Sequence, residues 1–307
     1  MKFLLVASAL TVGLGASIVA VAQFPAEDPA EACSKSNMKS STQVNGYTFR
    51  SYSSKEARTA CVQVIHNGRV IFRRTNDNDG WFTIGQPANK ADQVPAIPNG
   101  TDLTGRGHPD MTVAAYSGGA HCCLSHYVFE LEPEFKLLAH LDAQDTWPAY
   151  FDDLDHDGHY YYIAEDWTFA YWLGDFASSP AAPIILRWVD DPARGGFHLA
   201  LDKMARLTPG SAELREDLEN AKTDFATQVM GGGPLWGPIM RLIYSGHPDL
   251  AWRFLDEALP AKFSSNKDDW TEEFCIGLKE SPYWTDLEVT MRDIPPACAR
   301  AKPGRKG

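Results

Sequence analysis

The sequence is poor in basic residues. Its 307 residues include 28 Lys and Arg against 40 Asp and Glu, which gives a formal net charge of −12. Removing residues 1–22, which contain Lys2 and no acidic residue, would leave 27 basic residues and a net charge of −13. This balance argues against a nucleic-acid backbone or an anionic membrane surface as the partner. We expect neither.

Long apolar runs are missing after residue 22. A membrane-spanning helix needs roughly 20 consecutive apolar residues, and only residues 3–19 approach that length. This run follows Lys2 and leads into Ala20-Val21-Ala22, a small-residue cleavage site, so residues 1–22 are predicted to be a secretory signal peptide. An uncleaved anchor is the alternative. We predict an exported protein, periplasmic or extracellular, with no integral membrane segment after cleavage.

Common catalytic signatures are also missing. The sequence has no Ser-His-Asp signature, zinc-protease helix or phosphate-binding loop. The carboxylates of Asp102, Asp110, Asp145, Asp153 and Asp166 could include a pair for glycoside hydrolysis, a reaction that depends on the distance between two carboxylates. We therefore predict a non-enzymatic binding or envelope-associated protein, with an extracellular glycoside-type hydrolase that uses carboxylates near the calcium loop as the alternative.

Cysteine is present in an even number. Six cysteines in an exported chain favour up to three disulfides. The simplest pairing is local: Cys33 with Cys61, Cys275 with Cys298, and Cys122 with its neighbour Cys123. In the alternative, each of the two adjacent sulfurs bonds a distant cysteine.

Short β-rich runs dominate the first two thirds of the chain. Residues 23–45 lack periodicity and are predicted to be an extended lead-in. Residues 61–66 and 69–74 flank Asn67-Gly68, a strong hairpin signal. Further strands are predicted at residues 111–116, 124–131, 135–141, 160–165, 183–189 and 197–201. The turn residues that separate them leave no room for crossover helices, so the sheets should be antiparallel.

Helical periodicity begins near Pro209. Helices are predicted at residues 211–229, 235–244, 248–259 and from 268 or 269 to 278. The second and third should form an antiparallel helical hairpin, because only a short Ser-Gly-His link joins them. The predicted fold is α+β, an antiparallel β-rich meander or sandwich over residues 46–205 followed by an α-helical domain over 206–298 and a tail over 299–307.

One segment occurs twice, 51 residues apart, from Asp102 and from Asp153, each time before a strand. In the second copy Asp153, Asp155, Asp157 and Gly158 have the spacing that wraps oxygens around a hard cation. The first copy has Thr104 and Arg106 at two of these positions, so Arg106 could supply the missing positive charge. Calcium is the predicted cofactor of the second copy, and a polar turn with solvated aspartates is the alternative.

These loops resemble the calcium loops of FG-GAP and VCBS repeats, the loop-strand units of integrin α-chain propellers. The resemblance implies that Asp153, Asp155 and Asp157 bind calcium together with the main-chain carbonyl of His159. Asp110 matches the last carboxylate of the family loop, whereas the second copy has Tyr161 there.

The resemblance also implies propeller-blade-like units. The β-rich region is long enough for about three blades, fewer than the roughly four that a closed propeller needs, so we expect an open arrangement. Residues 102–172 also look like a group of exported bacterial proteins that carry Gly-Gly-Ala-His-Cys-Cys and Trp-Thr-Phe-Ala-Tyr-Trp.

Aromatic residues gather around the second loop. They are Trp147, Tyr150, Trp167, Tyr171 and Trp172. Such side chains offer flat apolar faces with polar edges, so we predict a platform for a glycan or a protein ligand. Aromatic residues at alternating strand positions also fill cores, which is the alternative.

Overall fold

The computed structural model describes residues 32–120, 122–227, 232–292 and 294–304. The predicted signal peptide, residues 1–22, and residues 23–31 of the predicted lead-in lie outside these ranges. Within them, no helix combines the length and the apolar character needed to cross a membrane.

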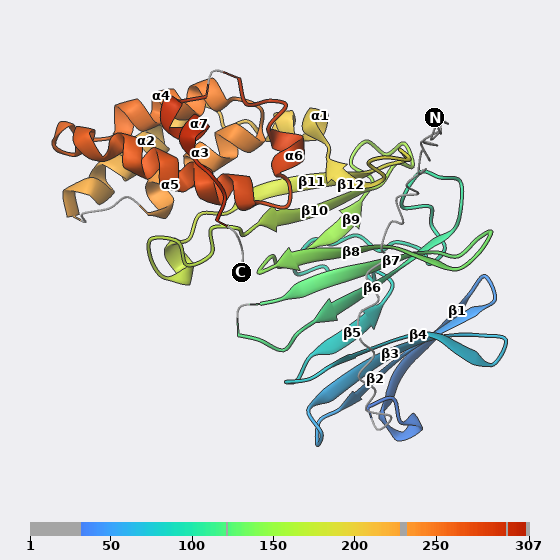
Figure 1. Ribbon diagram of the computed structural model, residues 1–307. Coiled ribbons are helices and arrows are strands. Elements are labelled where there is room, and N and C mark those ends of the chain that lie inside the picture. Colours follow the sequence, from blue (N-terminus) through green and yellow to red (C-terminus); the bar gives the residue numbers. More distant parts are fainter. Residues whose placement is uncertain (1–31, 121, 228–231, 293, 305–307) are drawn as a thin grey trace, which may run out of the picture.

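Three antiparallel sheets follow one another along the chain, each made of four strands that are consecutive in sequence (Figure 1). The first sheet contains β1 (Met38–Val44), β2 (Tyr47–Ser54), β3 (Thr59–His66) and β4 (Arg69–Asn76). The second contains β5 (Trp81–Ile84), β6 (Asp110–Tyr116), β7 (Leu124–Glu130) and β8 (Lys136–Gln144). The third contains β9 (Tyr150–Asp152), β10 (Tyr161–Asp166), β11 (Ala182–Val189) and β12 (Gly196–Leu199). The predicted antiparallel β-rich region is therefore confirmed.

The hairpin predicted around Asn67-Gly68 joins β3 to β4, and both turn residues have positive φ. The predicted lead-in needs a correction, because residues 38–44 form β1 and pair with β2. A second turn of the same kind, Asn45-Gly46, connects these strands. β1 is an edge strand with largely exposed side chains, so it carries no alternation of apolar and polar residues for sequence reasoning to detect.

Helices follow the third sheet. Their bounds are α1 (Leu201–Met204), α2 (Ser211–Thr227), α3 (Gly233–Tyr244), α4 (Pro248–Ala258), α5 (Lys267–Glu280), α6 (Trp284–Leu287) and α7 (Pro296–Arg300), with short 3-10 segments η1 (Lys35–Asn37), η2 (Phe176–Ser178), η3 (Ala205–Leu207) and η4 (Ala261–Asn266). α3 packs against α4, as the predicted helical hairpin requires. Gly246 in the link has positive φ, and a proline begins α4.

Two apolar cores hold the layers together. Between the first and second sheets, the rings of Phe49 and Phe72 lie 5.8 Å and 4.8 Å from that of Phe129. A larger core joins the second sheet, the third sheet and the helices, as Ile184 of β11 and Ile239 of α3 illustrate. The change from strands to helices comes between β12 and α1, a few residues before the predicted boundary between residues 205 and 206. The helices share their core with the third sheet (Figure 1).

The cysteines pair locally, as the simplest pairing predicts. Cα–Cα distances are 5.3 Å for Cys33–Cys61, 3.0 Å for Cys122–Cys123 and 5.1 Å for Cys275–Cys298. Among the described residues there is no free cysteine. One bond thus anchors the chain before β1 to β3, and another ties α7 to α5.

Two buried polar side chains join the second and third sheets. The Gln86 amide donates to the carbonyl of Phe151 at 2.8 Å and accepts from its N–H at 2.8 Å, so it extends the hydrogen bonding of β9. Nδ1 of His126 on β7 lies 2.8 Å from the hydroxyl of Tyr162 on β10. Both contacts satisfy polar groups that would otherwise be buried without partners.

We predict that Gln86→Ala lowers the free energy of unfolding by about 2–4 kcal/mol, because it leaves both backbone groups of Phe151 unpaired in the core. Urea denaturation of the mature protein measures this. Gln43→Ala, at an exposed position of β1, is the control and should change stability by no more than about 0.5 kcal/mol. Equal effects of the two substitutions would contradict the role of Gln86.

His126 should make stability depend on pH. Burial, with the nearby His140, lowers the pKa of His126 from 6.5 to about 3. Between pH 6.5 and about pH 3, His126 is protonated in the unfolded chain but neutral in the folded chain. The stabilisation that the buried neutral His126 provides is therefore complete above pH 6.5 and declines as the pH falls. We predict that the stability difference between wild type and His126→Gln falls by about 1.4 kcal/mol per pH unit between about pH 6 and 4. A difference that stays constant in denaturant titrations would contradict this.

Candidate functional site

An aromatic pocket lies at one end of the second sheet, where β5 and β7 begin and β6 and β8 end. Its volume is about 380 Å³, within the range of small-molecule sites. Its lining residues are Trp81, Tyr116, Ala120, Leu124, Gln144, Asp145, Thr146, Trp147 and Phe176. They come from all four strand ends, the link to β9 and η2, so antiparallel pairing brings together residues that are far apart in sequence.

The aromatic side chains form an open corner. Trp81 stacks on Tyr116 with ring centroids 5.7 Å apart, and its edge meets Trp147 at 6.0 Å. Trp147 is 59% exposed although it is one of the largest apolar side chains in the protein. An exposed indole beside two further rings forms an exposed apolar patch, which makes this corner a candidate binding site.

The polar side chains of Gln144 and Thr146 in the pocket are hydrogen-bonded to the backbone at the end of β10. Oε1 of Gln144 accepts from the N–H of Trp167 at 2.7 Å, and Oγ1 of Thr146 accepts from the N–H of Glu165 at 2.9 Å. Glu165 accepts from the Trp167 indole at 3.0 Å, and burial raises the pKa of its carboxyl group. Asp145 adds a carboxylate to the lining. Fixed amide, hydroxyl and carboxyl groups thus stand beside the aromatic faces.

The predicted aromatic platform is only partly at the pocket. Trp147 lines it, whereas Trp167 stacks at 4.8 Å on Phe176, which lines it. Tyr171 is 58% exposed and its ring lies 5.8 Å from that of Phe176. Tyr150 on β9 is half-buried and does not line the pocket.

Trp172 faces the other way. Its ring packs against Trp236 at 5.4 Å and Phe274 at 6.0 Å, inside the core shared with the helices. Trp172 therefore packs against the helices and does not line the pocket. Sequence reasoning missed Trp81 and Phe176 because they belong to a four-residue strand and to a single 3-10 turn, which are too short to show periodicity.

The two related loops have the same internal hydrogen bonds. In the first, Asp102 accepts from the N–H groups of Arg106 at 3.1 Å and Gly107 at 2.7 Å. In the second, Asp153 accepts from the corresponding groups of Asp157 at 3.0 Å and Gly158 at 2.9 Å. Each loop connects the first strand of its sheet to the second. The sequence echo therefore reflects equivalent positions in two successive sheets.

Arg106 does not serve its own loop as we expected. Its guanidinium pairs with Glu130 at 3.0 Å and Asp190 at 3.5 Å, so it links the second sheet to the chain after β11. The loop is held by Asp110, the first residue of β6, whose carboxylate accepts from the N–H groups of Leu103 at 2.9 Å and Thr104 at 3.0 Å. Burial raises the pKa of Asp110 to about 6, against the opposing effect of these hydrogen bonds.

In the second loop, Asp155 pairs with two cations from the segment after β12. Its carboxylate contacts Nζ of Lys203, and it accepts from Arg206 at 2.7 Å. Lys203, only 5% exposed, lies 5.0 Å from the ring centroid of Tyr161. Lys203 and then Arg206 lower the pKa of Asp155 to about 2.

The carboxylates of this loop all have partners within the protein. Both oxygens of Asp155 are directed at Lys203 and Arg206, and both of Asp153 accept backbone N–H groups. Asp157 pairs with His159 at 3.1 Å. In the part of the chain that the structure describes, no group of three or more His, Cys, Asp or Glu side chains is arranged to hold a metal.

The loop and the aromatic pocket are far apart. The loop precedes β10, and the residues next to the pocket follow it. The six residues of β10 span about 20 Å at about 3.3 Å per residue. The Asp153 loop and the residues next to the pocket therefore lie at opposite ends of β10.

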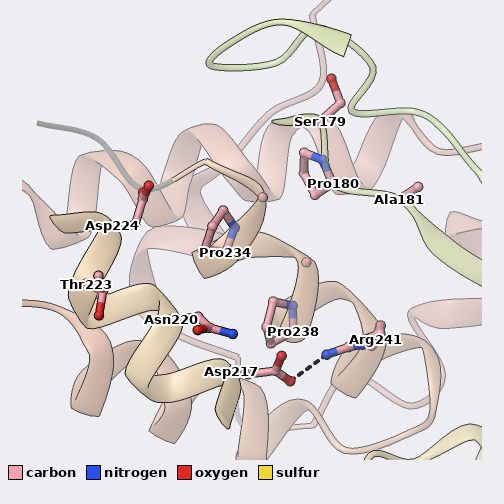
Figure 2. Close-up of a pocket in the computed structure, with 12 residues that line it drawn as sticks. Ser179, Pro180, Ala181, Asp217, Asn220, Thr223, Asp224, Pro234, Pro238 and Arg241 are labelled. Atoms are coloured by element: carbon pink, nitrogen blue, oxygen red, sulfur yellow. Dashed lines mark hydrogen bonds and ion pairs between the residues drawn. The ribbon is translucent and has the colours of Figure 1, made fainter. Parts of the chain in front are cut away.

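Another cavity, of about 590 Å³, lies between α2, α3 and the chain before β11 (Figure 2). Arg241 enters it, and this guanidinium pairs with Asp217 at 2.5 Å and Glu213 at 3.1 Å. Burial raises the pKa of Asp217. None of the site residues predicted from the sequence lines this cavity, and its arginine is engaged in holding α3 to α2.

Comparison with protein-family models, with curated proteins and with solved structures gave no match to this chain. The site is therefore interpreted from its own geometry.

The charges around Asp155 generate a prediction about thermal stability. Lys203→Met should lower the melting temperature more than Arg206→Gln, because Lys203 is buried and Arg206 is largely exposed. Calcium or a chelator should not change the melting temperature of the wild type, whereas Lys203→Met, which releases Asp155, should gain a calcium response through mass action. A calcium-dependent increase in the wild type as large as in Lys203→Met would contradict this assignment.

Proposed function

We propose that this chain is an exported carbohydrate-binding protein and that the aromatic pocket at Trp147 is its binding site. The main support is the exposed corner of Trp81, Tyr116 and Trp147 beside fixed polar groups. A sugar ring presents an apolar face of C–H groups and an equatorial rim of hydroxyls. The indole faces suit the first, and Gln144, Asp145 and Thr146 suit the second.

Export is supported by the N-terminal sequence pattern and by the three local cysteine pairs, since disulfides persist in oxidising compartments. The resemblance to FG-GAP units is supported by the equivalent loops of the second and third sheets and by their four-stranded, sequential topology. We propose that the three sheets are blade-like units. Lys203 takes over the charge compensation that calcium provides in the family loop.

A hydrolase is the second candidate, in a form different from the one the sequence suggested. Asp145 lines the aromatic pocket, and Glu165, with its raised pKa, lies in the strand next to it. A carboxyl group whose pKa is raised by burial is suited to act as a general acid. The Asp153 loop, at the far end of β10, has no part in this candidate.

We predict that the mature protein binds oligosaccharides on a glycan array and that Trp147→Ala weakens binding of the selected glycan by at least about tenfold in calorimetry. Val289→Ala, at an equally exposed apolar position of the helical region, is the control and should bind as the wild type does. Undiminished binding by Trp147→Ala, or no binding of any glycan, would contradict the proposed site. Release of reducing ends that Asp145→Asn abolishes while binding persists would favour the hydrolase.

A further inference from the structure

The loop between β6 and β7 contains the bonded pair Cys122–Cys123, and Ser117 closes the loop by hydrogen bonds to the backbone of this pair. Oγ of Ser117 donates to the carbonyl of Cys122 at 2.7 Å and accepts from the N–H of Cys123 at 2.6 Å. The N–H of Ser117 also donates to the carbonyl of Cys123 at 3.0 Å. Position 119 leaves no room for a side chain, because a Cβ there would collide with the Cys122 carbonyl. The loop is thus folded tightly around the cysteine pair.

The same loop supplies one side of the aromatic pocket. Tyr116 and Leu124, the residues at its two ends, line the pocket, and so does Ala120 within it. The hydroxyl of Tyr116 donates to the carbonyl of Gly119, so the loop holds the ring on which Trp81 stacks. A change in the loop that displaces the carbonyl of Gly119 therefore removes the hydrogen bond that holds the Tyr116 ring beside Trp81.

The three disulfides differ in accessibility. Cys61, Cys275 and Cys298 are completely buried, so each of the other two bonds has at least one sulfur in the core. Cys122 and Cys123 are both partly exposed in a surface loop. Thiol–disulfide exchange requires an attacking thiolate to reach a sulfur atom, so a dithiol reductant should reach this pair first.

We propose that Cys122–Cys123 is a redox switch that controls the shape of the aromatic pocket, with the oxidised form as the binding form. A dithiol reductant transfers two electrons and two protons to the pair and becomes a cyclic disulfide, while the S–S bond is replaced by two thiols. The hydrogen bonds between Ser117 and the backbone of the cysteine pair are then lost, and the Gly119 carbonyl no longer holds the hydroxyl of Tyr116. The effect on a glycan ligand rests on the proposed function, whereas the effect on the tryptophans does not.

Partial reduction of the mature protein with dithiothreitol, followed by alkylation and peptide mapping, identifies the bond that opens first. Iodide quenching of tryptophan fluorescence and calorimetric titration of the glycan chosen on the array are measured before and after reduction. The variant Cys122→Ser/Cys123→Ser is the matched control because its loop is open in either condition.

We expect alkylation at Cys122 and Cys123 before any other cysteine, increased quenching, and affinity reduced by about fivefold or more as preorganisation is lost. The double serine variant should show the increased quenching and weaker binding without reductant and should not respond to it. Prior opening of Cys275–Cys298, or unchanged quenching after alkylation of Cys122 and Cys123, would overturn the proposal. Unchanged affinity despite changed quenching would overturn its control of binding. Altered quenching in a protein that binds no glycan would refute the proposed function and leave the switch standing.

Discussion

The buried carboxylate of Asp166 sets the relation between the third sheet and the helices. It is 1% exposed and accepts from the hydroxyl of Ser281 at 2.6 Å, from the hydroxyl of Tyr244 and from the N–H of Thr168 at 2.8 Å. A buried carboxylate is tolerated only when donors replace its water. Tyr244 ends α3 and Ser281 follows α5, so both helices must dock in a single register.

The position of Asp166 matters for the pocket as well. It ends β10, and the next residues lead through Trp167 to η2, whose Phe176 lines the pocket. The same strand end therefore fixes the helices on one side and the aromatic wall on the other. Apolar packing alone would allow the helices to slide on the sheet, whereas directed hydrogen bonds to one carboxylate do not.

Much of the fold could be predicted because its signals are local. Asn67-Gly68 defines its hairpin, and the periodicity of α3 and α4 is contained in a dozen residues each. The candidate site is different, since Trp81, Trp147 and Phe176 meet only through the pairing of distant strands. Likewise, 48 residues separate Lys203 from Asp155, and nothing near the Asp153 loop reveals the cation that occupies Asp155. β9, with only three residues, depends on Gln86 for part of its hydrogen bonding and could not be recognised from its own composition.

Sequential four-stranded sheets have a consequence for the order in which the chain folds. Each sheet pairs strands that are neighbours in sequence, so its contacts are local and only short loops must be closed. Such a sheet can form soon after its last strand has been synthesised. The first sheet has a core with the second, and all described members of that core come before the end of β8. In the third sheet, in contrast, β10 ends at Asp166, whose carboxylate accepts from Tyr244 at the end of α3 and from Ser281 after α5. Ser281, one of these donors, lies 115 residues after Asp166, so this carboxylate gains its full set of donors only when that part of the chain is present. The pocket beside it is therefore among the last parts of the protein to take its final shape.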